Sequence, residues 1–350
     1  MINKNIIIKD DITIIQALKL MDEVDRKLLI ICDGDTFKGV LSIGDIQRAL
    51  LKQISMQSPV KLILRSDITI ASSSQKKEEI LAEMKRERIE CMPVVNEQGI
   101  LVDTLEWATE FGIEYKRTLD ENYTVVIMAG GKGTRLKPLT NLIPKPLVPI
   151  SDKTVIEEII HQFTSVGCKD FFVSINHMGD LIKEFFKRKN ITEYNINFIE
   201  EEKPLGTAGS LYLLKDKLDK TFFVSNCDII VDVDFKEMMK YHKENNNIIT
   251  ALSVVKDFSI PYGTLETKEN GKLVGLREKP KMIYQINSGV YILEPEALNY
   301  ISDNEFIHIT TLMQRLIDDN KNVGVFPISD GSYFDMGNWD EYNKVIEKYK

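Results

Sequence analysis

Residues 125–150 read VVIMAGGKGTRLKPLTNLIPKPLVPI, and this stretch decides the fold of the chain. Its first four residues are apolar and predict a buried strand, and the glycines that follow predict a loop. Gly130, Gly131 and Gly133 carry no Cβ, so the backbone can adopt positive φ and approach a ligand closely. A strand that leads through such a loop towards a helix presents backbone N–H groups to phosphate oxygens. The stretch therefore predicts a phosphate-binding loop.

Two basic residues follow the loop. Arg135 offers a planar fork of donors, and Lys145 offers a compact ammonium group. Prolines stiffen the segment around Lys145, so we expect this side chain to be held in place; they lie at positions 138, 144, 146 and 149. The pattern is not a P-loop, and it is not a dinucleotide fingerprint, because Leu136 stands where the third glycine belongs.

The whole run resembles the signature of sugar-1-phosphate nucleotidyltransferases, G-G-x-G-T-R-L-x-P-L-T followed by P-K-P, and matches it at each of those positions. The resemblance implies an α/β fold with a Rossmann-like, mostly parallel sheet of the glycosyltransferase-A-like type. It implies catalytic roles for Arg135 and Lys145, which would neutralise phosphate groups. It also implies nucleotide contacts from these residues: Ala129, Gly130, Gly131, Gly133, Thr134, Glu201, Gly206 and Thr207.

The composition is that of a soluble globular protein. A length of 350 residues favours two domains, and 43% hydrophobic with 28% charged residues is ordinary for such a chain. The net charge of −8 argues against an extended nucleic-acid-binding surface, so any phosphate site must be a local basic pocket. Four scattered cysteines indicate reduced thiols in a cytoplasm. We expect no signal peptide, no membrane span and no membrane partner.

Residues 1–117 contain a weak internal repeat, whose halves open with Asp11-Ile-Thr-Ile and Asp67-Ile-Thr-Ile. Each half predicts a helix, two strands joined by a glycine-containing turn, and a second helix. This order resembles a tandem pair of CBS motifs, with α+β units at residues 1–55 and 56–117. Such a module implies either a regulatory nucleotide site or a structural, oligomerising role, and we expect a homo-oligomer.

The best match to the CBS motif is GVLSIGDIQRAL at residues 39–50. Its Ser42 and Asp45 stand where the family places ribose-binding residues, so they are a possible ligand site. The same two residues equally form a helix-capping box that needs no ligand. In the second half Trp107 replaces the acid, so at most one ribose site is intact.

Residues 118–122 read as the end of a polar linker, and residues 123–350 as the catalytic domain, in which strands and helices alternate. A capping box at Thr154 and Glu157 predicts one of its helices. Ligands of such sheets lie at the carboxyl ends of strands, and the candidate residues fall there. The C-terminal end predicts one closing helix, without the left-handed β-helix that some relatives append.

The resemblance assigns Asp228, which ends the apolar run FFVSNCD, and Asp335, in SYFDMGNWDEY, as ligands of Mg²⁺. Magnesium needs one or two carboxylates plus waters and phosphate oxygens, so these acids suit it. Asp228 would also be catalytic. Cys227 replaces the glycine usual before the first acid, and neither this change nor Asn338 removes a metal ligand.

The sugar and its phosphate would contact a second cluster. Tyr262-Gly263, Glu278-Lys279-Pro280 and Asn287-Ser288-Gly289 resemble, in order, the sugar-binding elements of the family. By this resemblance, the backbone N–H of Gly263 would donate to a sugar hydroxyl, and Glu278 would accept from sugar hydroxyls. Lys279 would pair with the sugar phosphate. It gives Asn287 polar contacts to sugar or phosphate.

Glu201 lies five positions before the glycine of L-G-T, where the family often reads the base. Guanine presents adjacent N1–H and N2–H₂ donors that suit a carboxylate, whereas uracil and thymine suit an amide. Glu201 therefore favours GTP, unless residues 200–202 are only a solvated acidic run.

Taken together, the residues favour transfer of GMP from GTP to a hexose-1-phosphate, and the resemblance given next implies glucosamine-1-phosphate as that acceptor. The combination resembles the guanylyltransferases of bacterial legionaminic acid synthesis. Mannose-1-phosphate guanylyltransferases and uridylyl or thymidylyl enzymes are the alternatives within the class. A nucleotide-sensing regulatory protein with a silent transferase domain is the alternative outside it, and the intact set of basic and acidic residues argues against that interpretation.

Overall fold

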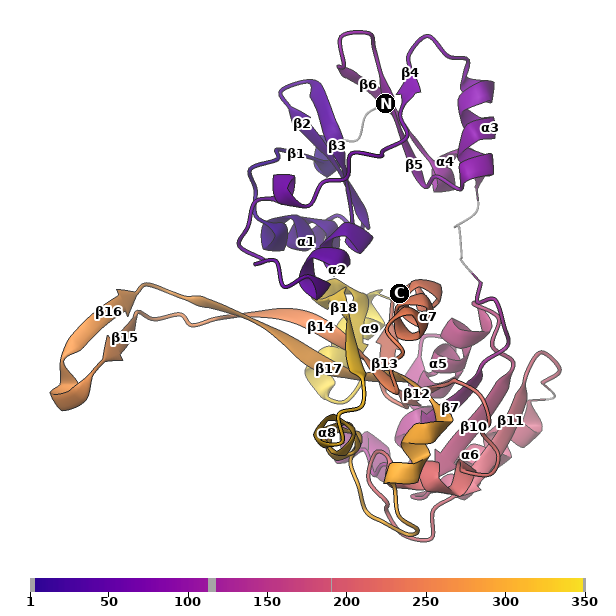
Figure 1. The fold of residues 1–350 in the computed structure, drawn as a ribbon. Coiled ribbons are helices and arrows are strands. Elements are labelled where there is room, and N and C mark those ends of the chain that lie inside the picture. Colours follow the sequence, from indigo (N-terminus) through magenta and orange to yellow (C-terminus); the bar gives the residue numbers. More distant parts are fainter. Residues whose placement is uncertain (1–3, 113–117, 190, 349–350) are drawn as a thin grey trace. The chain divides into compact units, whose positions relative to one another are not determined.

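The structure is a computed structural model that describes residues 4–112, 118–189 and 191–348. The chain divides into two compact units, Met1–Arg117 and Thr118–Lys350 (Figure 1). Among the described residues, no helix has both the length and the apolar character needed to cross a bilayer.

The first unit contains the same small sheet twice. The sheet orders are β1-β2-β3 and β4-β5-β6, and in each sheet the first pairing is parallel and the second antiparallel. The strands are β1 (Ile7–Ile8), β2 (Leu28–Asp33), β3 (Thr36–Ser42), β4 (Ala71–Ser72), β5 (Cys91–Val95) and β6 (Leu101–Glu106). The helices are α1 (Ile14–Glu23), α2 (Ile43–Leu51), α3 (Lys77–Glu87) and α4 (Trp107–Phe111). The predicted internal repeat is therefore present.

The first repeat extends beyond the boundary expected after residue 55. The N–H groups of Ile14 and Ile15 donate to the carbonyls of Ser58 and Met56, at 2.9 and 3.0 Å. Residues up to Val60, whose N–H bonds to Ile12, therefore belong with the first sheet.

Asp45 is the acid of a capping box at the start of α2. Its Oδ2 accepts from the N–H and the hydroxyl of Ser42, at 2.8 and 2.7 Å. Its Oδ1 pairs with Arg48 and, at 2.9 Å, with Arg65. The side chain is buried, so both oxygens are engaged within the chain. This arrangement matches the capping interpretation of Ser42 and Asp45, and ribose binding stays a prediction.

The second unit is built on a seven-stranded sheet of order β11-β10-β7-β12-β17-β14-β18. Four of its six pairings are parallel and two, both made by β17, are antiparallel. Its strands are β7 (Thr124–Met128), β10 (Asp170–Ile175), β11 (Asn195–Glu200), β12 (Phe222–Asn226), β14 (Ile249–Ser259), β17 (Lys281–Leu293) and β18 (Val323–Ser329). The mostly parallel α/β sheet expected from the sequence is confirmed.

Helices cover both faces of this sheet. They are α5 (Val155–Thr164), α6 (Gly179–Arg188), α7 (Phe235–Glu244), α8 (Ile309–Asp318) and α9 (Trp339–Lys348). On β7, Val125 and Ile127 join the core that contains residues of α5, α6 and α7. Val126 and Met128 join the opposite core, with α8 and the 3₁₀ segments η6 (Gly209–Leu214) and η8 (Pro295–Tyr300). Period-two alternation thus divides the strand between two cores.

Thr154 and Glu157 form the predicted capping box of α5. The Glu157 carboxylate accepts from the N–H and the hydroxyl of Thr154, both at 2.8 Å.

Residues 118–122, which were expected to be a linker, pack on the second unit. Leu119 is buried in the core beside α5, and its N–H donates to the Val166 carbonyl at 2.8 Å. Asn122 bonds to Asp170 and to the N–H of Lys169. The linker assignment was wrong here because one apolar residue anchors a polar run; residues 113–117 lie outside the described residues.

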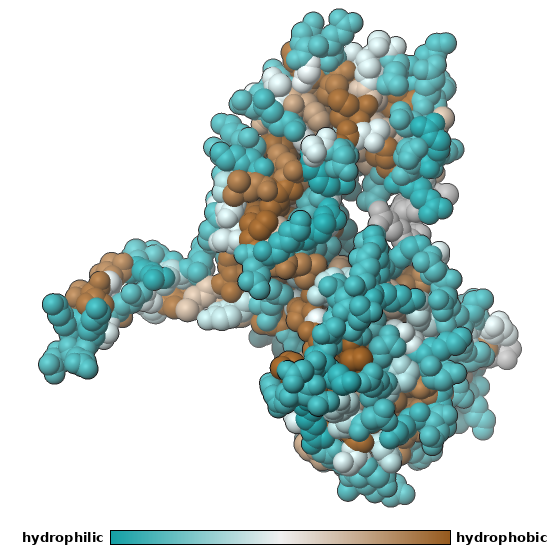
Figure 2. Space-filling view, in the orientation of Figure 1, coloured by the Kyte–Doolittle hydropathy of each residue, from teal (hydrophilic) through white to brown (hydrophobic). Residues whose placement is uncertain are grey.

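β14 and β17 run beyond the rest of the sheet. β18 pairs with β14 only as far as Val255, whereas β14 and β17 pair on to Ser259 and Lys281. The resulting ribbon continues into a hairpin of β15 (Thr264–Thr267) and β16 (Leu273–Arg277). We call residues 256–285 the arm. It projects away from the sheet in Figure 1, and hydrophobic side chains lie on its visible face in Figure 2.

Replacing Asp45 by alanine tests the structural role of its carboxylate. Asp45→Ala should lower the free energy of unfolding of the first unit by about 1–3 kcal/mol, because the N–H and hydroxyl of Ser42 and two arginines lose a buried acceptor. Urea unfolding of the full chain, followed by circular dichroism, measures this change. Asp67→Ala, at the exposed acid that opens the second repeat, should cost less than about 0.5 kcal/mol. Equal losses in the two variants would contradict the role.

Candidate active site

Neighbouring parallel strands end at one edge of the large sheet. β7 leads into the glycine loop at Ala129, and β12 leads to Asp228. Asn176 follows β10, and Glu201 follows β11. The strands are paired in a register that opposes Asn226 to Met128, so their carboxyl ends meet. The glycine loop, Glu201 and Asp228 therefore lie at strand ends as expected, and Asn176 joins them there although it was not predicted.

The glycine loop follows β7 as predicted, but only one of its three glycines needs positive φ. Gly133 has φ +60°, and a Cβ there would lie 3.0 Å from carbons of Lys145 and Thr140. Gly130 and Gly131 do not have positive φ, so that part of the expectation was wrong. A Cβ on Gly130 would lie 3.0 Å from the Oε1 of Glu201. At Gly130 the constraint is therefore the close approach of the Glu201 side chain, which leaves little room for a Cβ.

The proline-containing segment after the loop forms no α-helix. It consists of three 3₁₀ turns, η3 (Thr134–Leu136), η4 (Leu139–Asn141) and η5 (Lys145–Leu147). Prolines at 138, 144 and 146 prevent a longer helix, because each lacks an N–H donor. The indole N–H of Trp339, on α9, donates to the Lys137 carbonyl at 3.0 Å and so ties the segment to α9.

Lys145 is held as predicted. Its side chain is 7% exposed, and its Nζ pairs with Oδ2 of Asp228. The neighbouring Cys227 is buried, and this burial raises the pKa of its thiol to about 12. Cys227 is therefore neutral and is not a nucleophile. The pair places one fixed positive charge and one carboxylate beneath the glycine loop.

Asp335 lies next to Asp228 through strand pairing. β13 (Ile229–Val231) and β19 (Tyr333–Asp335) are antiparallel, with Ile229 opposite Asp335. The Met336 N–H donates to the Asp228 carbonyl at 2.8 Å. Burial and then the negative charge of Asp228 raise the pKa of Asp335. Two carboxylates thus repel each other at short range, which is the arrangement that a divalent cation relieves.

Gly337 allows Arg135 to reach this cluster. A Cβ at Gly337 would lie 2.5 Å from Oδ1 of Asp335 and 2.7 Å from Nη2 of Arg135. The Gly337 N–H also donates to Asp335 at 2.6 Å. Gly337 was not predicted as a positioning residue, although the D-x-G pattern that begins at Asp335 is its signal in the sequence.

Glu201 is not a solvated side chain. It is 8% exposed, between the exposed Glu200 and Glu202. Its Oε1 accepts from the Ser174 hydroxyl at 2.6 Å, and its Oε2 accepts from the Leu205 N–H at 3.0 Å. The acidic-run interpretation therefore fails for Glu201. A carboxylate offers about four acceptor sites, so it keeps capacity for a ligand.

Ser174 and Asn176, which sequence reasoning missed, hold Glu201 in place. Ser174 is fully buried at the end of β10, and the Asn176 amide donates to the Glu201 carbonyl at 2.6 Å. In the sequence, their signal was a pair of small polar residues at the end of an apolar strand. Only the pairing of β10 with β11 brings these residues next to Glu201.

Gly206 and Thr207 contact the chain before α8. Gly206 has φ +82°, and a Cβ there would lie 2.4 Å from the Ile307 carbonyl oxygen. The Thr207 hydroxyl accepts from the Ile309 N–H at 3.0 Å. Their observed contacts are thus structural, and nucleotide contact by Ala129, Thr134 and these two residues stays a prediction.

The predicted sugar-binding residues divide into two places. Gly263 and Glu278 lie together, since a Cβ on Gly263 would be 3.0 Å from Oε2 of Glu278. With Lys279 they are exposed on the arm, away from β13 in Figure 1. Asn287 lies at the root of the arm, where its amide donates to the Tyr291 hydroxyl at 2.7 Å. The structure therefore brings only Asn287 towards the strand ends.

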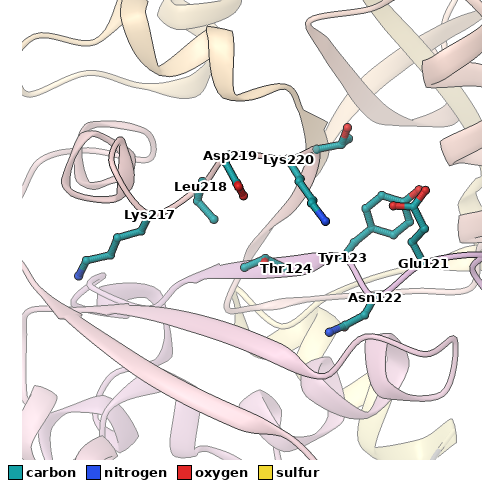
Figure 3. Close-up of a pocket in the computed structure, with 9 residues that line it drawn as sticks. Glu121, Asn122, Tyr123, Thr124, Lys217, Leu218, Asp219 and Lys220 are labelled. Atoms are coloured by element: carbon teal, nitrogen blue, oxygen red, sulfur yellow. The ribbon is translucent and has the colours of Figure 1, made fainter.

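Two pockets lie at the opposite, amino-terminal end of the sheet. Figure 3 shows a small one between the segments that precede β7 and β12, lined by Tyr123 and Lys220 among others. The other, of about 230 Å³, adjoins α7 and shares Tyr123. Neither contains a candidate residue, so they are not part of this site.

Comparison with protein families matches both units. The Nucleotidyl transferase family matches residues 124–350, and the CBS domain matches residues 1–52. A UTP–glucose-1-phosphate uridylyltransferase from Synechocystis sp. is 30% identical over 241 residues, 63% of this chain and 62% of the relative. A mannose-1-phosphate guanyltransferase from Yarrowia lipolytica is 36% identical over 183 residues, 50% of each chain. The chain thus spans between 50% and 62% of the length of these relatives.

Solved structures resemble the second unit. HddC from Yersinia pseudotuberculosis has a TM-score of 0.51 and 28% identity, over 65% of this chain and 100% of its own. HddC complexed with GMP-PN has a TM-score of 0.50 and 26% identity, with the same coverage.

The serine beneath Glu201 gives a test of this geometry. Ser174→Ala should lower the free energy of unfolding by about 1–3 kcal/mol, because a buried carboxylate oxygen loses its hydroxyl donor. Ser225→Ala is the matched control: Ser225 is equally buried near the end of β12 but donates to a neutral carbonyl, that of Asn226. Chemical denaturation should give the smaller loss for Ser225→Ala, and equal or reversed losses would contradict a charge-assisted bond.

Proposed function

This chain belongs to the nucleotidyl transferase family, and we propose that it transfers a nucleoside monophosphate from a nucleoside triphosphate to a hexose-1-phosphate. A phosphate oxygen of the sugar phosphate attacks the α-phosphorus. The bond from the α-phosphorus to the oxygen that bridges to the β-phosphate breaks, and pyrophosphate leaves with the electron pair. The products are a nucleoside diphosphate sugar and pyrophosphate.

The observation that carries the proposal is the cluster of Lys145, Asp228 and Asp335 beside the glycine loop. In-line transfer needs positioned charge more than a covalent residue. Lys145, already fixed, would neutralise phosphate oxygens, and Arg135 adds a fork that spans two oxygens. The neutral Cys227 is consistent with direct transfer.

We propose Asp228 and Asp335 as the ligands of Mg²⁺. Two adjacent oxygen donors, with water and phosphate oxygens to complete the coordination, fit this ion. Among the described residues, no group of three or more histidine, cysteine, aspartate or glutamate side chains could hold a metal ion. The proposed site therefore uses two carboxylates together with water and phosphate oxygens. When bound, the cation would supply charge neutralisation at the phosphates. Lys145 and the strand pairing of β13 with β19 keep the two carboxylates in place.

We propose that GTP is the preferred donor and that Glu201 reads guanine. Glu201 is buried at a strand end, and its carboxylate is oriented by Ser174 and the Leu205 N–H. Adjacent N1–H and N2–H₂ donors suit its remaining acceptor sites. Guanyltransferases among the relatives, and HddC with its ligand named as a GMP derivative, support this choice.

For the acceptor we propose a hexose-1-phosphate, with glucosamine-1-phosphate first, on the resemblance of the whole motif set. Mannose-1-phosphate is the acceptor named for several relatives and is the alternative. Pyrophosphate release assayed across four nucleoside triphosphates and a panel of sugar-1-phosphates tests the reaction, the base and the sugar together. No release with any pair would reject the proposed activity.

The acid at the end of β12 gives the most direct mutational test. Asp228→Asn keeps the size of the side chain but removes the anion that anchors Lys145 and the proposed cation. Turnover with magnesium should fall at least about a hundredfold. Asp180→Asn, at a fully exposed acid on α6, is the control and should leave turnover unchanged. Near-normal activity of Asp228→Asn would remove Asp228 from the metal site.

Base choice is tested at Glu201. Glu201→Gln should keep its contacts within the chain, because the Ser174 hydroxyl can accept from the new NH₂ while the other oxygen stays with Leu205. Towards guanine, the NH₂ would face a donor and leave a polar group unpaired, at a cost of about 1–3 kcal/mol. The kcat/KM for GTP should fall about tenfold to a hundredfold, and that for UTP less.

The matched control is Glu202→Gln, an exposed acid in the same run. It should leave the ratio of the GTP and UTP kcat/KM values unchanged. An unchanged ratio in Glu201→Gln, or a wild-type preference for UTP, would assign base choice to backbone groups instead.

A further inference from the structure

Strand β17 carries a bulge at the root of the arm, beside the candidate site. In its pairing with β14, Tyr291 lies opposite Ala251 and Asn287 lies opposite Ser253. β17 therefore advances by four residues where β14 advances by two. The extra residues fold out of the strand around Gly289, which has φ +92°. Bulges of this kind re-aim side chains and are frequent next to active sites.

The bulge brings Asn287 and Tyr291 into contact. Residues four apart in a regular strand are separated by about 13 Å, because each residue advances the chain by about 3.3 Å, and their side chains do not meet. Here Nδ2 of Asn287 donates to the Tyr291 hydroxyl at 2.7 Å. Tyr291 is 2% exposed, and burial raises its pKa to about 12, so the hydroxyl stays protonated. The contact is therefore a property of the bulge.

The orientation of the Asn287 carboxamide is fixed from both ends. The N–H of Gly289 donates to its Oδ1 at 3.3 Å. A backbone N–H can only donate, so this end of the amide is the oxygen, and the NH₂ faces the Tyr291 hydroxyl. An amide NH₂ has two hydrogens, and no second hydrogen bond from this group is found in the part of the chain that the structure describes. One N–H of Asn287 is therefore available to a ligand.

The bulge lies against the strand that leads to the proposed metal site. Val290 is opposite Ser225, near the end of β12. A Cβ at Gly289 would lie 2.5 Å from Nδ2 of Asn226, so only a glycine lets the two strands approach this closely. Asn226 is the last residue of β12, two positions before Asp228. The available N–H is thus held beside the strand end where the proposed transfer takes place.

We propose that Tyr291 is a positioning residue for the hexose-1-phosphate. Its hydroxyl holds the Asn287 carboxamide so that the available N–H donates to an oxygen of the sugar or of its phosphate. This inference rests on the proposed function and concerns the acceptor substrate alone. Three strands separate β17 from β11, which precedes the proposed base contact Glu201, so recognition of the base should not depend on Tyr291. Without the hydroxyl, the carboxamide can rotate, and substrate binding must order it again.

The test is Tyr291→Phe, which keeps the buried ring and removes the hydroxyl. The KM for the hexose-1-phosphate should rise about threefold to tenfold, the effect of one hydrogen bond, and the KM for GTP should stay within about twofold of the wild type. In an Asn287→Ala background the same substitution should change the sugar KM by less than about twofold, because Tyr291 acts through Asn287. A tyrosine with only a structural role would shift both KM values together, and its effect would add to that of Asn287→Ala.

Tyr123→Phe is the matched control. Tyr123 is 4% exposed and precedes β7, at the amino-terminal end of the sheet, and its hydroxyl accepts from Nζ of Lys243 at 2.6 Å. This variant also loses a buried hydroxyl contact, and it should leave both KM values unchanged. Circular dichroism and urea unfolding check that the variants are folded. An equal rise of the sugar KM in the control would contradict a role specific to Tyr291.

Binding measurements separate this inference from the reaction itself. Calorimetry uses glucosamine-1-phosphate and mannose-1-phosphate, with magnesium and a GTP analogue that has a methylene bridge between its α- and β-phosphates. The analogue blocks transfer, and Tyr291→Phe should raise the dissociation constant of the sugar phosphate by the same factor as its KM. Wild-type turnover with an unchanged sugar KM in Tyr291→Phe would overturn the inference and leave the proposed function intact.

A wild-type chain that binds a sugar phosphate but releases no pyrophosphate would reject the proposed function alone. The dissociation constant of Tyr291→Phe then decides the inference: a rise supports it, and an unchanged value overturns it. A wild-type chain that neither binds a sugar phosphate nor releases pyrophosphate would overturn both.

Discussion

The buried pair of Lys145 and Asp228 is the contact on which the candidate site depends. A carboxylate and an ammonium taken out of water are costly unless each finds a partner of opposite charge. Asp228 also has Asp335 beside it, and burial and then the negative charge of Asp228 raise the pKa of Asp335. Lys145 supplies the positive charge that lets two acids lie at one strand end. Under the proposed function, the same ammonium would neutralise a phosphate without a change of position.

Features set by local chemistry were predictable from the sequence. The capping boxes at Ser42 and Thr154 involve residues three positions apart, and both are formed. The strand before the glycine loop and the acid after β12 followed from apolar runs that end in polar residues. The prolines after the loop, quoted as stiffeners, are also why no α-helix forms there.

Contacts made through tertiary register could not be predicted. Ser174 meets Glu201 only because β10 and β11 pair side by side, and the two residues are 27 positions apart. Gly337 matters only because Arg135 approaches it from a distant turn. Asp45 shows a different limit, since the same serine and acid spacing serves a helix cap or a ribose. In the structure the Asp45 carboxylate pairs with Arg48 and Arg65. The spacing of Ser42 and Asp45 in the sequence does not predict these contacts.

The arm shows why motif order and spatial order differ. Gly263 and Glu278 resemble sugar-binding elements by sequence, and they do lie together, but on a ribbon that leaves the sheet where β18 ends. Strand periodicity predicts two faces and does not say where a neighbouring strand stops. β14 has eleven residues and β17 thirteen, against seven in β18, so the surplus must project. The projecting ribbon leaves side chains such as Phe258 and Tyr284 exposed, because no neighbouring strand or helix of its own sheet extends far enough to bury them.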